Sequence, residues 1–275
     1  GVADKVTLQD GDLMDQGSLV RVLQEVRPSE IYNLAAQSFV KSSWQQPNLT
    51  GMVTGLGATN MLESTRTVCS DARFYQASSS EMFGAIREPL QSETAPFYPR
   101  SPYAAARLYA HWMTVNYRES FGMHASSGIL FNHESPLRGV EFVTRKITDG
   151  VARIKLGMQK TLALGNLEAR RDWGHARDYV KVMWSMLQQD KPDDYVAATG
   201  RTASVQEFCD LAFAHVRLAP QKHIVIDSSF LRPAEVNVLQ GNPRKAFEKL
   251  GWTAETTLEQ LVAEMVDADI ARLEP

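Results

Sequence analysis

Short apolar runs alternate with helix-like patterns along residues 6–198 of the chain. Runs of a few hydrophobic residues predict strands, and longer stretches with apolar residues every three or four positions predict amphipathic helices. The predicted strands are residues 6–8, 30–34, 73–76, 124–131 and 195–198. The predicted helices are residues 16–26, 47–70, 101–121, 142–156 and 176–189. This alternation is typical of an α/β protein built on a doubly wound, largely parallel sheet.

The pattern changes after residue 200. The last part of the chain shows predicted helices at 204–217, 243–250 and 256–272, a short apolar run HIVI at 223–226, and the loop segment LRPAEVN. Strands are scarce here, so we expect a smaller, mainly helical part that packs directly on the sheet.

Composition narrows the class of protein. The 275 residues include 44% hydrophobic side chains, and 29 Lys and Arg against 32 Asp and Glu give a net charge of −3. Neither nucleic acid nor an anionic membrane is therefore expected as the main partner, and no segment is apolar enough to predict a membrane span. The two cysteines, far apart, indicate a reducing compartment, by default the cytoplasm. The six histidines lack the close spacing of zinc ligands, so no metal is expected.

The segment SPYAAARLYA places Tyr103 and Arg107 four residues apart on one helix face. A cation at that distance favours the phenolate form of a tyrosine, which would make Tyr103 a base. The same letters are also an ordinary helix start, with Ser101 as N-cap and Pro102 at the first position. The spacing alone leaves both interpretations open.

Two further segments follow predicted strands, at the sheet edge where open α/β folds bind ligands. QASSSEMFG (76–84) presents three serines and Glu81, although Ser-Ser-Ser-Glu is also a good helix cap. NLAAQS (33–38) offers small residues that let a flat ring approach the backbone, although it also reads as a plain strand-to-helix turn. Downstream, the segments FNHESPLRG, VTRK, LGN, RRDW and RPAEV lie in or next to predicted loops, and all but LGN carry basic residues, as binding of a diphosphate and a sugar requires.

Together these segments resemble the GDP-mannose 4,6-dehydratases, a family of extended short-chain dehydrogenase/reductases. The resemblance covers nearly the whole chain and is carried by YQASSSEMFG, PFYPRSPYAAARLYA, VNYRESFGMHASSGILFNHESPLRG, FVTRK, RDWGHARDYV and RPAEV. It implies a Rossmann-like fold, bound NADP, GDP-mannose as substrate, a lyase reaction that gives GDP-4-keto-6-deoxy-mannose, and a homodimer or homotetramer. Related TDP-glucose dehydratases would carry an aspartate before the glutamate.

The resemblance also implies roles for individual residues. Tyr103 would be the base at O4 of the hexose, Glu81 the acid/base at C5 and C6, Ser79 the hydroxyl that holds O4, and Arg107 the cation beside Tyr103. The cofactor would contact Asp12, Leu13, Leu34, Ala35, Ala36, Gln37, Ser38, Tyr103, Arg107, His133 and Arg138. The substrate would contact Asn132, Lys146, Leu164, Gly165, Asn166, Arg171, Arg232 and Glu235. Residues 1–133 with about 172–200 would form the cofactor-binding domain, and about 134–171 with 201–275 the nucleotide-sugar-binding domain.

Three departures from the family pattern shape the expectations. Position 79 is usually threonine, so Ser79 loses only a methyl group. Position 107 is usually lysine, and the planar fork of Arg107 is expected to impair catalysis. The chain also lacks the glycine-rich turn after a first strand, so we expect that its start is missing and that it binds NADP weakly.

Two rival interpretations remain open from the sequence. One is a catalytically impaired or inactive family member or fragment, favoured by Arg107 and the absent turn. The other is a dehydratase or epimerase that acts on a different nucleotide sugar.

Overall fold

The computed structural model describes residues 2–230, 234 and 236–274, and its chain forms two compact units. The first unit comprises Gly1–Ser78, Ser101–Gly128 and Met186–Asp194. The second comprises Ser79–Arg100, Ile129–Ser185 and Tyr195–Pro275. The chain therefore passes between the units several times, and each unit is described by itself.

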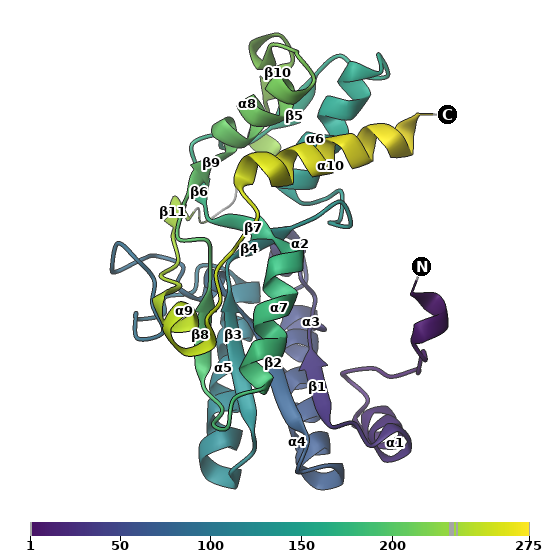
Figure 1. Ribbon diagram of the computed structural model, residues 1–275, viewed down its shortest axis with the longest axis vertical. Helices are drawn as coiled ribbons and strands as arrows, with labels where there is room; N and C mark the ends of the chain where they lie inside the picture. The colour runs from purple at the N-terminus through teal and green to yellow at the C-terminus, as the bar shows by residue number, and fades with distance from the viewer. Residues whose placement is uncertain (1, 231–233, 235, 275) are drawn as a thin grey trace. The chain divides into compact units, whose positions relative to one another are not determined.

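A four-stranded sheet has the order β1-β2-β3-β8 (Figure 1). Its strands are β1 (Glu30–Asn33), β2 (Arg73–Ser79), β3 (Ala125–Leu130) and β8 (Asp194–Ala197). β1 and β2 pair in parallel, with Ile31 opposite Phe74. All six residues of β3 are buried, and parallel strands covered on both faces carry such continuous buried runs. The structure confirms the predicted α/β fold with a parallel sheet.

Three helices of the first unit lie close to the positions predicted at 16–26, 47–70 and 101–121, whereas residues 40–45 form a short helix that the sequence analysis did not predict. The helical segments are α1 (Gln16–Val26), α2 (Val40–Gln45), α3 (Pro47–Thr50), the π-helical segment η2 (Gly51–Leu56), α4 (Gly57–Val68) and α5 (Pro102–Phe121). The single helix predicted at 47–70 forms as the continuous run α3, η2 and α4. Gly57 permits the close packing of this run, because a Cβ there would come 2.8 Å from Leu13 Cβ. α1 packs against α4, and their side chains join a small core with Phe74 of β2.

The predicted strand at residues 6–8 is wrong. These residues have no regular structure, and Leu8 is 90% exposed. A strand is stable only when its backbone groups pair with a neighbour. None of the strand pairs in the described residues includes 6–8, and the short segment Val-Thr-Leu cannot supply that pairing by itself.

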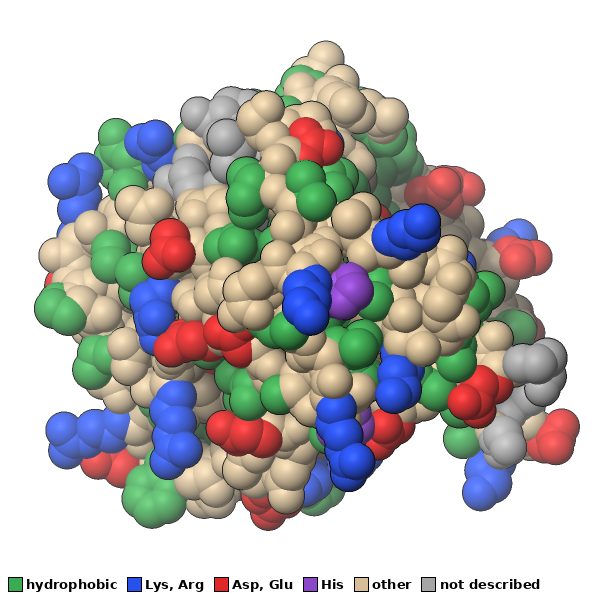
Figure 2. Space-filling model, turned by 90° about the horizontal axis from the view of Figure 1, so that it is seen from above, with side chains coloured by type: hydrophobic (Ala, Val, Ile, Leu, Met, Phe, Trp, Pro, Cys, Tyr) green, Lys and Arg blue, Asp and Glu red, His purple; other side chains and the backbone are tan. Residues whose placement is uncertain are grey.

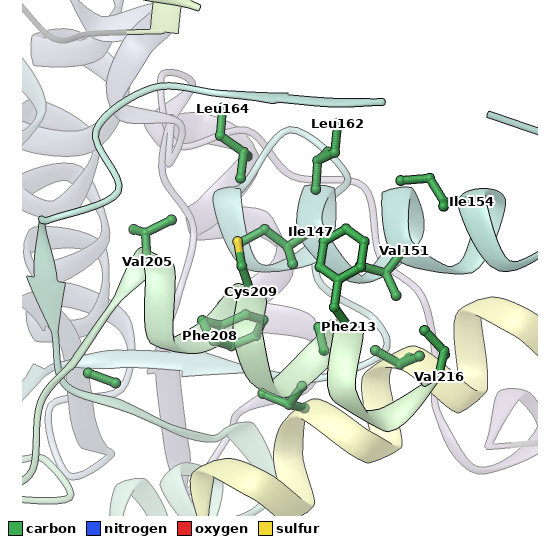
Figure 3. Packing of buried hydrophobic residues seen from close by; sticks show 14 of the residues in the cluster. Ile147, Val151, Ile154, Leu162, Leu164, Val205, Phe208, Cys209, Phe213 and Val216 are labelled. Carbon is green, nitrogen blue, oxygen red and sulfur yellow. The ribbon is translucent and has the colours of Figure 1, made fainter. Parts of the chain in front are cut away.

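The second unit is built around three helices, α6 (Val143–Lys155), α8 (Val205–His215) and α10 (Leu258–Leu273). Figure 3 shows Ile147 and Val151 of α6 pointing toward Phe213 of α8, with Leu162 beside them. α10 packs against both helices. One apolar cluster of this unit joins side chains of α6, α8 and α10, and it holds α6 and α10 side by side.

Shorter elements complete the two units. The remaining helices are α7 (Ala176–Leu187), α9 (Arg244–Leu250), η1 (Ala3–Lys5), η3 (Ser80–Met82), η4 (Pro220–Lys222) and η5 (Ser228–Phe230). The remaining strands are β4 (Asn132–Glu134) with β7 (Trp173–His175), β5 (Leu162–Leu164) with β10 (Ile224–Ile226), and β6 (Arg170–Arg171) with β11 (Val238–Leu239) and β9 (Ala203–Ser204). The sequence pattern did not reveal most of these two- and three-residue strands.

The surface in Figure 2 mixes acidic and basic side chains among hydrophobic ones, as the small net charge predicts. Among the described residues, no helix is both long and apolar enough to span a bilayer.

Candidate active site

The first turn of α5 positions Tyr103 and Arg107. Ser101 is the N-cap, and its hydroxyl accepts a hydrogen bond from the amide of Ala104 at 3.1 Å. Pro102 occupies the first helical position, where a missing N–H costs nothing. The ordinary helix start that the sequence indicated is therefore present. It places both side chains in the interior, since Tyr103 is 8% exposed and Arg107 is 5% exposed.

Arg107 contacts both the phenol and the sheet. Its Nε donates to the Tyr103 hydroxyl at 3.1 Å, and its Nη1 donates to the Ala77 carbonyl at 2.6 Å. The guanidinium carbon also lies 5.4 Å from the centroid of the Tyr103 ring. The cation thus lies directly against the phenol, and a contact to β2 fixes its orientation.

His111 makes a second contact between α5 and β2 that the sequence analysis missed. Its Nδ1 lies 3.1 Å from the Ser78 hydroxyl, and the imidazole is 3% exposed. Burial lowers the pKa of His111, so the neutral ring is favoured. The spacing Tyr103, Arg107, His111 repeats every four residues on one helix face, and this periodicity was the available signal.

Ser79 and Glu81 lie at the end of β2, in the second unit. The Ser79 hydroxyl accepts a hydrogen bond from the Glu81 amide at 3.2 Å and caps the short helix η3. The capping interpretation is confirmed, and the cap fixes the Glu81 backbone two residues beyond the end of β2. Tyr103 and Arg107 belong to the first unit, so the convergence of the two pairs on one substrate stays a prediction.

A cavity of about 330 Å³ lies beside the carboxyl end of β1 in the first unit. Its walls include Leu13, Leu34 and Ala35, three of the residues predicted to contact the cofactor. A mostly apolar cavity of this size can accept a planar ring system. The structure thus brings together three residues from segments more than twenty positions apart.

Asp12 and Gln37, two other residues predicted to contact the cofactor, make hydrogen bonds within the loops beside this cavity. Asp12 Oδ1 accepts a hydrogen bond from the Met14 amide at 2.8 Å, which shapes the turn before α1. The Gln37 amide donates to Thr54 Oγ1 at 3.1 Å, and its side-chain oxygen accepts from Thr50 Oγ1 at 3.1 Å. Ala36 is partly buried and Ser38 is exposed in the same loop. These contacts fix the backbone that follows β1.

In the second unit, β4 carries Asn132 and His133. The His133 ring stacks on Tyr179 with centroids 4.9 Å apart, and its Nδ1 lies 2.9 Å from the Phe131 carbonyl. Arg138 follows in the next loop, where its Nε lies 3.1 Å from Glu134 Oε2. Asn132 is only partly buried, in parallel register with Trp173. This segment therefore has a fixed conformation.

Two of the substrate candidates, Lys146 and Gly165, meet around Phe230, an aromatic residue that the sequence analysis missed. Lys146 Nζ lies 3.2 Å from the centroid of the Phe230 ring. A Cβ at Gly165 would come 3.0 Å from Phe230 Cβ, so glycine allows the ring to approach the backbone. The signal was an aromatic residue directly before the LRPAEV segment.

The remaining residues predicted to contact the substrate differ in burial and in hydrogen bonding. Leu164 is 2% exposed and its side chain belongs to the apolar core, which leaves only its backbone for a ligand. Asn166 Oδ1 accepts from the Glu168 amide at 2.9 Å and forms a turn. Arg171 is buried and donates through Nη1 to the Arg170 carbonyl at 2.9 Å. Arg232 and Glu235 lie outside the described residues.

Asp172 is a further buried carboxylate beside these residues. Its Oδ1 accepts from the Thr199 amide at 2.8 Å and hydroxyl at 2.7 Å, and its Oδ2 accepts from the Gly200 amide at 2.9 Å. Burial raises the pKa of Asp172 to about 6, although these hydrogen bonds act in the opposite direction. Asp172 connects the strand that carries Arg171 to the turn after β8.

A family profile and two curated relatives that match this chain carry the same description. The sequence profile of a family described as GDP-mannose 4,6 dehydratase matches residues 1–265. GDP-mannose 4,6 dehydratase 1 of Arabidopsis thaliana is 53% identical over 267 residues, which cover 96% of this chain and 74% of the relative. GDP-mannose 4,6 dehydratase of Homo sapiens is 46% identical over 288 residues, with 98% and 77% covered.

Solved structures share the fold at lower identity. RMD from Pseudomonas aeruginosa, solved in complex with NADPH, superimposes with a TM-score of 0.88 at 24% identity, over 96% of this chain and 89% of that one. UDP-glucose 4-epimerase of Thermus thermophilus, solved in complex with NAD, gives 0.85 at 25% identity, over 98% and 86%. The first of these likenesses concerns the fold alone.

Proposed function

This chain belongs to the GDP-mannose 4,6-dehydratase family, and we propose that it converts GDP-mannose to GDP-4-keto-6-deoxy-mannose with loss of water. The observation that carries the proposal is the match over residues 1–265, with curated relatives about half identical across almost the whole chain. Ser79, Glu81 and Tyr103, the three residues to which the reaction would assign proton transfer and O4 binding, are all present.

Tyr103 removes the proton from the 4-hydroxyl while the Ser79 hydroxyl holds O4. The adjacent Arg107 guanidinium stabilises the negative charge that the phenol acquires. A ketone at C4 makes the C5 proton acidic, and Glu81 takes that proton and delivers a proton to the departing 6-hydroxyl. Two proton-transfer groups of different chemistry thus act in sequence on one sugar ring. The net reaction is a dehydration, so we assign a lyase activity.

The first unit fits a nicotinamide dinucleotide, which we infer to be NADP. The cavity at Leu13, Leu34 and Ala35 suits an adenine ring, and the loop at 34–38 would run along the ribose and phosphates. When bound, this cofactor accepts a hydride from C4 and returns it at C6. The chain itself holds the ring, fixes the loop through Gln37 and keeps Tyr103 and Arg107 shielded from water.

The second unit offers the groups that a nucleotide diphosphate sugar requires. Lys146 and Arg171 supply positive charge, and Asn132 and Asn166 supply amide groups. Lys146 lies against Phe230, an arrangement that also suits the stacking of a guanine base. We therefore assign sugar-nucleotide binding to this unit and dinucleotide binding mainly to the first, in the cytoplasm.

Self-association is part of the proposal, as a homodimer or homotetramer. α5 packs along α3 and η2, and these three helices carry exposed apolar side chains. These are Leu49, Met52, Leu56, Tyr109 and Trp112, each at least 41% exposed. Exposed apolar side chains gathered on adjacent helices support a contact between copies of the chain. Analytical ultracentrifugation of the wild type and of Leu56→Glu tests this part, because a charge in the contact would shift the species toward monomer.

An impaired enzyme is the second candidate, and Arg107 favours it. Its Nε and Nη1 both donate to protein groups, the Tyr103 hydroxyl and the Ala77 carbonyl. A lysine at this position would be a compact point donor for the ribose hydroxyls, whereas the wider guanidinium occupies the space beside the phenol. This candidate predicts the same products at a much lower rate.

In the experiment, the purified chain is incubated with NADP and, in parallel reactions, with one of four sugar nucleotides: GDP-mannose, GDP-glucose, UDP-glucose or dTDP-glucose. Products are identified by mass spectrometry and proton NMR. The proposal predicts that GDP-mannose alone loses water and gains a 6-methyl signal. Turnover of another nucleotide sugar instead, or epimerisation without loss of water, would overturn it.

A further inference from the structure

Asn33 and Gln76 form a buried pair of amide side chains at the carboxyl end of β1. The two residues lie opposite each other in the parallel register of β1 and β2, and Asn33 Nδ2 donates to Gln76 Oε1 at 2.9 Å. Both side chains are buried. Because an amide oxygen only accepts and an amide nitrogen only donates, this hydrogen bond fixes the direction in which the Gln76 nitrogen points.

The Gln76 nitrogen and Arg107 converge on one backbone carbonyl. Gln76 Nε2 donates to the Ala77 carbonyl at 3.2 Å, and Arg107 Nη1 donates to the same oxygen at 2.6 Å. A carbonyl oxygen has two lone pairs, and these two donors can occupy both. The residue pairs of β1 and β2 end at Asn33 and Gln76, so the Ala77 carbonyl lies just beyond the paired part of β1. Side-chain donors therefore help to orient this carbonyl.

Arg107 transmits that orientation to the phenol. Its Nε donates to the Tyr103 hydroxyl at 3.1 Å, while its Nη1 is held at the Ala77 carbonyl. The guanidinium is planar and rigid, so the direction of one N–H donor determines the direction of the others. A carbonyl that turned away from Nη1 would therefore also turn Nε away from the phenol. One series of hydrogen bonds thus runs through the first unit, over Asn33, Gln76, Ala77, Arg107 and Tyr103.

The position of α5 does not depend on this series alone. His111 Nδ1 lies 3.1 Å from the Ser78 hydroxyl, one helical turn beyond Arg107. The helix also packs along η2 and α4. Loss of the Gln76 amide should therefore loosen the Ala77 carbonyl and the guanidinium without displacing the helix.

We propose that Gln76 is a positioning residue, which keeps the Arg107 guanidinium aimed at the Tyr103 hydroxyl. It acts through the Ala77 carbonyl and is itself oriented by Asn33. Because Gln76 is fully buried, it influences the reaction only through Arg107. The inference rests on the proposed function in one respect, the role of Tyr103 as the base. The hydrogen bonds that hold Arg107 are independent of turnover.

The test compares Gln76→Met with Thr114→Val as a control. Methionine is close to glutamine in volume and has no amide. Thr114 is also fully buried, on α5, but its hydroxyl donates to the Ala110 carbonyl within the helix. The readout is the rate at which the Arg107 Nε–H exchanges with solvent, measured by NMR on the isotope-labelled chain without cofactor or substrate. The signal is assigned by its loss in Arg107→Lys.

We expect Gln76→Met to raise this exchange rate about tenfold, the effect of removing one buried hydrogen bond that holds the guanidinium in place. With saturating NADP, kcat should fall by a similar factor and KM for GDP-mannose should stay within about twofold, because the stabilised phenolate acts in the transition state. Thr114→Val should keep the exchange rate and kcat within about twofold. If Gln76→Met fails to fold by circular dichroism, Asn33→Leu replaces it with the same expectations, since the Gln76 amide then loses the donor that orients it.

An unchanged Arg107 exchange rate in Gln76→Met would overturn the proposal, and so would faster exchange with unchanged kcat. An equal rise of the exchange rate in Thr114→Val would indicate general loosening of α5 and would also overturn it. A wild-type chain that leaves GDP-mannose unchanged would instead contradict the proposed function. In that case the exchange measurement alone decides on Gln76.

Discussion

The Nε of Arg107 lies 3.1 Å from the hydroxyl of Tyr103, and the same guanidinium donates to the Ala77 carbonyl at 2.6 Å. The cation is therefore fixed by the sheet and aimed at the phenol. A charge-assisted hydrogen bond in a buried setting is stronger than one at the surface. The contact supports Tyr103 as the base. It also means that Nε and Nη1 of the guanidinium hydrogen-bond to protein groups.

Replacement of Arg107 by lysine should raise kcat. The smaller ammonium keeps the positive charge near Tyr103 and frees space beside the ribose, so we expect an increase of about tenfold, the size of one charged hydrogen bond in the transition state. Arg107→Met removes the charge and should lower kcat by at least about tenfold. Steady-state kinetics with saturating NADP measures both. If the two variants lose activity equally, the ribose argument is wrong.

Substitutions at Ser79 test whether its hydroxyl has two separate roles, capping the helix η3 and holding the substrate. Ser79→Thr keeps the hydroxyl that accepts from the Glu81 amide, so kcat should stay within about twofold and the fold should be unaffected. Ser79→Ala removes both the cap and the hydrogen bond to O4, so kcat should fall about a hundredfold. The comparison requires unchanged circular dichroism in both variants. Full activity in Ser79→Ala would show that this hydroxyl does not hold the substrate.

The two cysteines should differ in reactivity. Burial raises the pKa of the Cys209 thiol to about 12, and its side chain is fully buried. Burial also raises the pKa of Cys69, which the nearby Arg27 partly offsets, but this side chain is partly exposed. Because thiolates are the reactive form, a thiol reagent at neutral pH should modify Cys69 and spare Cys209 in the native chain.

Mass spectrometry after brief labelling checks this expectation. Cys69→Ser should leave the native chain unlabelled, and denatured wild type should take two labels. Labelling of native Cys209 at the rate of Cys69 would contradict the buried position of Cys209.

Low pH should lower the free energy of unfolding of the first unit, because Asp194 becomes protonated. The carboxylate accepts from Arg118 at 3.0 and 2.8 Å. Burial alone would raise the pKa of Asp194, but the hydrogen bonds and charge of Arg118 lower it below the ordinary value. A pKa that is lower in the folded state contributes stability above the unfolded value of about 3.9, and this stability is lost as pH falls through the folded pKa.

Asp194→Asn is the corresponding variant. At pH 7 it should be less stable by about 3 kcal/mol, because Arg118 keeps its charge without its partner. Below about pH 4 the difference from wild type should shrink, since the carboxylate of the unfolded wild type is then protonated and that of the folded state follows as pH falls to its lower pKa. Urea unfolding midpoints at several pH values from 3 to 7 measure the effect. A difference that stays constant over this range would rule out the ion pair as its cause.

The position of α5 followed from the sequence because this helix carries its own start and stop signals, whereas α2 was not predicted. Ser101 and Pro102 mark the start of α5, and Gly122, with φ of 67°, follows its last residue. The strand predicted at 6–8 failed because strand formation depends on a partner elsewhere in the chain. The short strands β6, β9 and β11 were missed for the same reason: two residues carry no periodicity, and only tertiary contacts pair them.

Some contacts of the candidate site could likewise be predicted from the sequence, and others could not. Tyr103 and Arg107 are close because helical spacing requires it, so their contact was predictable. The contact between Lys146 and Phe230 joins residues 84 positions apart, and no local pattern indicates it. The hydrogen bond from Arg107 to the Ala77 carbonyl was equally hidden, because a backbone acceptor leaves no trace in residue identity. Local chemistry could be inferred from the letters, whereas the long-range contacts required the folded chain.

The central claim is that Tyr103 and Glu81 carry out two successive proton transfers on a single hexose. Single-turnover absorbance at 340 nm, with the chain in excess over GDP-mannose, tests it through Tyr103→Phe and Glu81→Gln. We predict no absorbance in Tyr103→Phe, because oxidation at C4 fails. In Glu81→Gln we predict an absorbance that rises and persists, because C4 is oxidised but water is not lost. Persistent absorbance in Tyr103→Phe, or normal loss of water in Glu81→Gln, would contradict the account.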